Sequence, residues 1–164
     1  MSHNKELANF KNRLQGKVSI VGIGNRLRGD DGVGPEIIKR LKSILPTLLL
    51  FDVGETPENY LEKIAREKPN TIVLIDAVEL GASPGTIKII EGDDIRNESF
   101  STHNVSLKVV VNYLQKESSG DVFLLGIQPE TIEFGRGISK AVRESLENIV
   151  ETLEAGFSKG SRRL

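Results

Sequence analysis

The chain has 164 residues, and 22 lysines and arginines nearly balance 23 aspartates and glutamates, for a formal net charge of −1. Without a basic excess, nucleic acid is not an expected partner. There is no cysteine, which excludes disulfides, thiolate metal sites and a cysteine nucleophile. The N-terminal segment lacks the apolar core of a signal peptide, and no apolar run is long enough to span a membrane, so we expect a cytoplasmic protein with no membrane contact.

Helical and strand patterns alternate along the chain. The helices are predicted from apolar side chains recurring at a spacing of three and four residues, and the strands from short, dense apolar runs. In chain order the predicted elements are helix 4–15, strand 17–23, helix 35–45, strand 47–53, helix 57–67, strand 71–78, strand 86–90, helix 105–116, strand 121–127 and helix 139–155.

Several helix ends carry recognisable signals. Pro35 suits the first position of its helix, because a proline there loses no intrahelical hydrogen bond. Thr56 and Asn104 are predicted N-caps, since their side chains can accept from the first free N–H groups of a helix. Gly156 is the predicted end of the last helix.

The strand patterns indicate the fold. Residues 71–78 are almost continuously apolar, as in a strand covered on both faces. Residues 86–90 contain Lys88 and follow after a short connection, which favours an antiparallel strand near an edge; an acidic, polar loop is predicted over 91–103. We therefore predict an α/β protein, a three-layer α/β/α sandwich around a five-stranded, mostly parallel sheet with one antiparallel strand. We expect a single domain over residues 1–164, with an extra N-terminal helix in 1–15 and a flexible tail over 157–164.

A glycine-rich loop with two adjacent carboxylates follows the first strand. The dinucleotide fingerprint G-x-G-x-x-G fails here, because Leu27 stands where the third glycine belongs. Asp30 and Asp31 suit a cation better than a pyrophosphate. The alternative is that both acids only cap a helix and a turn.

Three candidate ligands fall at comparable places. Asp31 follows the first strand, Asp76 ends the third, and His103 closes the loop before helix 105–116. If the first and third strands are neighbours, two carboxylates and one imidazole can meet around a cation, and such ligands suit nickel, zinc, copper or iron.

Other interpretations of these residues remain open. Asp76 can cap the turn after its strand, and a lone loop histidine such as His103 is more often solvated than a ligand. Glu130 is another acid at a strand end, which can cap or help to bind a peptide. Ser101 and Thr102 adjoin His103, but adjacency in sequence does not make a triad.

Four ordered segments resemble the hydrogenase maturation endopeptidases, which trim a C-terminal peptide from the large subunit of [NiFe] hydrogenases. The segments are GIGNRLRGDDGVGP at 22–35, LIDAVELGASPGTI at 74–87, STHNVSL at 101–107 and LGIQPETIEFG at 125–135. The sequences of these segments most resemble those of the type that matures hydrogenase 3 of formate hydrogenlyase. Helix 4–15 precedes the usual start of this family.

The resemblance implies an enzyme that recognises a large-subunit precursor already holding nickel. The family's two acids and its histidine fall on Asp31, Asp76 and His103, which would contact the metal and serve catalysis. Nickel would be supplied by the substrate rather than held by the resting enzyme, and we expect a monomer. The alternatives are a non-catalytic nickel-handling or metal-sensing chaperone using the same three residues, and a nucleotide-binding module.

Overall fold

The computed structural model describes residues 2–97 and 106–157. Five strands form one sheet in the order β2-β1-β3-β5-β4, and only β4, at an edge, runs antiparallel to its neighbour. The predicted fold class is confirmed. The strands are β1 (Val18–Ile23), β2 (Leu49–Gly54), β3 (Thr71–Ala77), β4 (Ile87–Glu91) and β5 (Asp121–Ile127).

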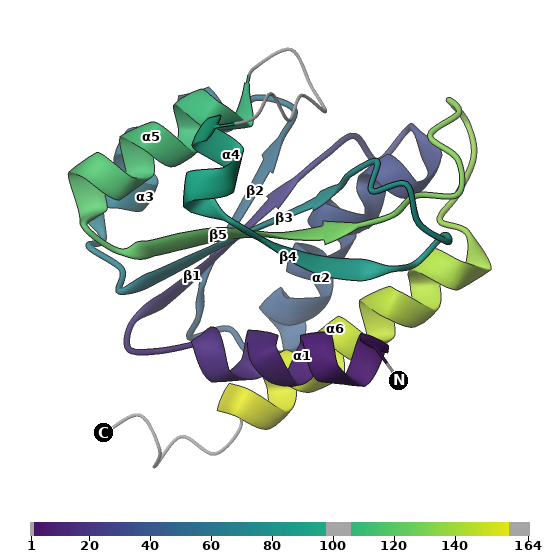
Figure 1. The fold of residues 1–164 in the computed structure, drawn as a ribbon, viewed down its shortest axis with the longest axis horizontal. Helices are drawn as coiled ribbons and strands as arrows, with labels where there is room; N and C mark the ends of the chain where they lie inside the picture. Colours follow the sequence, from purple (N-terminus) through teal and green to yellow (C-terminus); the bar gives the residue numbers. More distant parts are fainter. Residues whose placement is uncertain (1, 98–105, 158–164) are drawn as a thin grey trace.

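Helices cover both faces of the sheet (Figure 1). One apolar cluster packs α1, α2 and α6 against the sheet, and a second packs α3, α4 and α5 against the opposite face. The helices are α1 (Ser2–Arg13), α2 (Val33–Ile44), α3 (Leu61–Arg66), α4 (Gly92–Asn97), α5 (Leu107–Ser118) and α6 (Lys140–Phe157), with short 3₁₀-helices η1 (Gly29–Gly32) and η2 (Pro57–Asn59).

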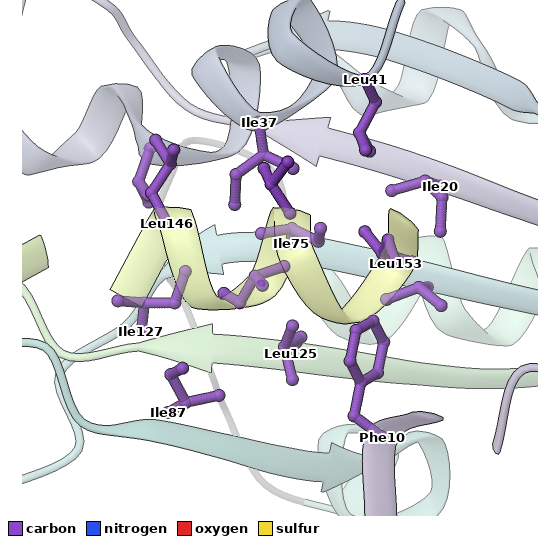
Figure 2. Packing of buried hydrophobic residues seen from close by; sticks show 14 of the residues in the cluster. Phe10, Ile20, Ile37, Leu41, Ile75, Ile87, Leu125, Ile127, Leu146 and Leu153 are labelled. Carbon is purple, nitrogen blue, oxygen red and sulfur yellow. The ribbon is translucent and has the colours of Figure 1, made fainter. Parts of the chain in front are cut away.

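The central strands are buried on both faces, which explains their continuous apolar runs. Every residue of β1 and β3 is buried. Figure 2 shows Ile75 and Leu125 of the sheet beside Leu146 and Leu153 of α6, all members of one core cluster. The carboxyl ends of β1, β3 and β5 are therefore held in a rigid frame. None of the helices within residues 2–97 and 106–157 combines the length and the apolar character that a membrane span needs.

Several predicted helix ends were wrong. Helix α2 begins at Val33, so Pro35 is its third residue, which is tolerated because first-turn N–H groups have no intrahelical partner. Thr56 makes no side-chain cap, and η2 separates it from the short α3. Ser106 caps α5 by accepting from the N–H of Lys108, and Asn104, the predicted cap, lies outside the described residues. Helix α6 passes through Gly156 to Phe157.

The predicted polar loop 91–103 was also partly wrong, because α4 occupies its first half. Fully buried Ile95 anchors this helix, and the acidic residues around it leave no helical apolar period in the sequence. Strand β4 follows β3 after a short connection, but these two strands do not pair. Residues 78–86 instead pass the end of β5, where the Gly85 N–H donates to the carbonyl of Gln128, and β4 pairs with the far side of β5.

Helix α1 covers the edge strand β4. The Glu6 carboxylate accepts from the backbone N–H of Ile89, which would otherwise point out of the sheet. Arg13 bonds Glu91 of β4 and Asp121 of β5, and its guanidinium lies 4.4 Å from the ring centroid of Phe123. Such a cover protects the free backbone groups of an edge strand.

Candidate functional site

The loop after β1 folds back so tightly that glycine is required. Gly24 has a φ of +143°, and a Cβ on it would lie 1.8 Å from the Asp31 carbonyl oxygen. A Cβ on Gly34 would lie 2.5 Å and 2.7 Å from the carbonyl oxygens of Ile23 and Ile75. The first turn of α2 therefore rests on the carboxyl ends of β1 and β3, and η1 lies at that edge.

Asp31 lies in η1 and is only 6% exposed. Its Oδ2 accepts from the N–H of Asn25 at 2.9 Å. The Asn25 side chain in turn donates to Glu55 Oε2 at 3.1 Å and accepts from the N–H of Leu27. Asp31 is thus tied to the ends of both β1 and β2.

Asp30 has a different set of partners. Its buried carboxylate accepts from the N–H groups of Glu130 and Thr131 and from both the N–H and the hydroxyl of Ser139. Ser139 directly precedes α6, and its Oγ accepts from the N–H of Val142. Asp30 therefore ties the β5–α6 segment, residues 128–139, to η1. These contacts favour a structural role for this acid over a role as a metal ligand.

Asp76 is fully buried near the end of β3, opposite Gly126 of β5. Ile72 and Leu74 belong to the core cluster beneath α5, so strand alternation directs Asp76 to that same face. β1 and β3 are neighbours, as the predicted site requires, and η1 contacts β3. Asp31 and Asp76 therefore share one edge of the sheet.

His103, Ser101 and Thr102 lie outside the described residues, so the predicted Asp31–Asp76–His103 set stays a prediction. Within residues 2–97 and 106–157, no three acidic or histidine side chains form a group able to hold a metal ion. Glu130 is exposed, and its N–H donates to Asp30.

An open pocket lies beside Asp31, between the ends of β1 and β2. Its lining includes Asn25, Arg26, Asp52 and Glu55. At this pocket, Arg26 forms ion pairs with two acids. Its Nη1 lies 2.9 Å from Glu36 Oε1, and its Nη2 lies 3.5 Å from Asp52 Oδ2. Sequence reasoning missed Asp52 and Glu55, although the rule that selected Asp31 and Asp76, acids at strand ends, applies to both.

Gln128 was likewise not singled out. This buried amide accepts from the N–H groups of Leu80 and Ala82 and donates to Glu79. It therefore joins the segments that leave β3 and β5, and it steadies the sheet edge on the side of Asp76. Its position directly after an apolar strand was the available signal.

Comparisons with known proteins agree on one family. A family model described as a hydrogenase maturation protease matches residues 35–155. The hydrogenase 3 maturation protease of Escherichia coli is 33% identical over 141 residues, which cover 84% of this chain and 89% of that protein. The crystal structure of a [NiFe] hydrogenase maturation protease, HycI from Thermococcus kodakarensis, has a TM-score of 0.83 at 32% identity, covering 92% of this chain and 99% of the other.

The solution structure of the endopeptidase HycI from Escherichia coli is similar as well, with a TM-score of 0.76 at 31% identity, covering 85% of this chain and 90% of that one. These matches confirm the resemblance to this family. The protein belongs to the hydrogenase maturation protease family.

Proposed function

We propose that this protein is an endopeptidase that removes a C-terminal peptide from the nickel-loaded precursor of a [NiFe] hydrogenase large subunit. The supporting observation is that two nearly inaccessible carboxylates lie at one edge of the sheet: Asp31 in the loop after β1, and Asp76 near the end of the neighbouring parallel strand β3. Membership of a protease family supports the reaction class. We further propose that the enzyme acts as a cytoplasmic monomer.

Nickel enters this proposal as part of the substrate. Carboxylate and imidazole groups suit this metal, so Asp31, Asp76 and His103 would contact the nickel of the precursor. Carboxylates shielded from water attract a cation more strongly than exposed ones, which favours the loaded precursor over the empty one. Hydrolysis then needs a water and a polarised carbonyl. The metal can activate the water or polarise the carbonyl, and Asp31 or Asp76 can accept the proton of the water or donate one to the leaving amine.

The test compares nickel-loaded and nickel-free precursor by mass spectrometry. We expect the C-terminal peptide to be lost only from the loaded form. Cleavage should disappear in Asp31→Ala, Asp76→Ala and His103→Ala. The matched control is Glu62→Ala on α3, whose carboxylate is 80% exposed. Cleavage of both precursor forms would contradict nickel recognition, whereas nickel-dependent association without cleavage would favour the chaperone.

A further inference from the structure

Three large apolar side chains are exposed beside the candidate site. Leu27, Ile132 and Phe134 are 61%, 45% and 76% exposed. The Gly135 N–H donates to the Leu27 carbonyl at 2.8 Å, and Arg28 Nε donates to the Ile132 carbonyl at 3.3 Å. The loop after β1 and the β5–α6 segment therefore lie side by side, and we call Leu27, Ile132 and Phe134 the apolar patch.

The backbone beneath the apolar patch is fixed. Besides the four bonds to the Asp30 carboxylate, the N–H of Asp30 donates to the Thr131 carbonyl and that of Gly29 to the Arg136 carbonyl. Gly29 has a φ of +54°, and a Cβ there would lie 2.6 Å from the Thr131 carbonyl oxygen. An exposed aromatic side chain on a pre-ordered segment is typical of a binding surface, because little ordering entropy remains to be lost.

The position of the apolar patch restricts what can bind there. Asp31 directly follows Asp30 in η1, and Asp30 binds the segment that carries Ile132 and Phe134, so Asp31 and the apolar patch belong to the same pair of joined loops. The rim carries charges of both signs, including Arg28 and the Arg136–Glu133 ion pair at 3.2 Å. An apolar centre with a mixed, arginine-containing rim suits a protein surface rather than a polyanion.

We propose that the apolar patch docks an apolar segment of the large-subunit precursor and contributes affinity that does not depend on nickel. The identity of this partner rests on the proposed function. Docking here and metal contact at Asp31 are then two separate parts of recognition. The first brings the precursor to the enzyme, and the second distinguishes its loaded form.

The test uses Phe134→Ser and the double variant Ile132→Ser/Phe134→Ser in the full chain. The matched control is Val109→Ser on α5, the one other large apolar side chain exposed in the described part of the chain, at 56%. Biolayer interferometry gives Kd for loaded and nickel-free precursor, and the cleavage assay gives kcat and KM. Thermal melts check that the variants fold.

We expect Phe134→Ser to weaken binding of both precursor forms by about tenfold, as truncation of an interface aromatic anchor does. KM should rise in parallel while kcat and the melting temperature stay unchanged, and Val109→Ser should behave as wild type. Asp31→Ala should instead remove only the extra affinity for the loaded form.

An unchanged Kd and KM in the double variant would overturn the docking proposal while leaving the protease function intact. Docking through the apolar patch without cleavage by the wild type would leave this proposal standing and overturn the protease. Neither association nor cleavage would overturn both. Loss of a wild-type dimer in Phe134→Ser, with precursor affinity unchanged, would assign the apolar patch to contacts between copies of this chain and overturn docking.

Discussion

Asp30 and Asp31 are neighbours in sequence with different partners in the fold. The Asp30 carboxylate holds four donors from residues 130–139, whereas Asp31 accepts from Asn25 at the mouth of the pocket. Hydrogen bonds to a carboxylate are stronger than neutral ones. The sequence could show that two acids stand together, but not which of them meets a loop a hundred residues away.

Asp30→Asn should destabilise the protein. The amide has nearly the same size, but its NH₂ group would face backbone N–H donors and leave at least one buried donor unsatisfied. We expect the free energy of unfolding to fall by about 1–3 kcal/mol, measured by urea denaturation. Glu133→Gln, an exposed acid in the same segment, is the control and should change stability by less than about 0.5 kcal/mol. Equal effects of the two variants would contradict the role given to Asp30.

Helix α1 is part of the core rather than an appendage. Phe10 is fully buried, and its ring centroid lies 6.2 Å from that of Phe123 in an edge-to-face arrangement. Helix 4–15 was predicted from the helical spacing of its apolar side chains, which include Leu7, Phe10 and Leu14. What it covers could not be predicted, because that depends on the edge position of β4.

Phe10→Ala should leave a cavity between α1 and β5. We expect the free energy of unfolding to fall by about 3–5 kcal/mol, the usual cost of removing a buried phenylalanine ring. Lys11→Ala, at an exposed position of the same helix, should have little effect. Urea denaturation of both variants measures the free energy of unfolding. A small decrease for Phe10→Ala would mean that α1 is only loosely attached to the core.

The ion pair between α2 and α6 should make stability depend on pH. Arg40 donates to both carboxylate oxygens of Glu147 at 2.8 Å, and these hydrogen bonds lower the pKa of Glu147 below its ordinary value of 4.5. The folded state therefore favours the ionised carboxylate. The stabilisation is fully present above the unfolded pKa and is lost as the pH falls through the lower, folded pKa.

Both side chains of this pair are partly exposed, so the coupling is small. A double-mutant cycle with Arg40→Ala and Glu147→Ala should give about 0.2–1 kcal/mol at neutral pH. The coupling should disappear in strongly acidic buffer, where Glu147 is protonated. A coupling that persists there would show that packing of the two side chains, rather than charge, joins α2 and α6.

At the scale of the whole molecule, the sequence predicted the layers better than their details. Buried strands such as 71–78 are apolar apart from residues like Thr71 and Asp76, so their positions follow from the run of apolar side chains. Helix α4 was missed because Ile95 is its only fully buried apolar side chain, and the pairing of β4 depends on a turn around β5. Asp31 and Asp76 were proposed as ligands because strand ends gather ligands, and that role stays a prediction. Asp30's partners and the apolar patch depend on contacts between distant loops. His103 stays a prediction.

The last prediction concerns the edge of the sheet. Removing residues 1–15 takes away Glu6, Phe10 and Arg13, and it uncovers both the backbone of β4 and the ring of Phe123. Free edge strands pair with other chains, so the shortened protein should melt at a lower temperature and associate as its concentration rises. Light scattering after gel filtration measures this. Glu6→Ala, which keeps the helix, should associate far less. A shortened chain of unchanged size and melting temperature would mean that β4 needs no cover.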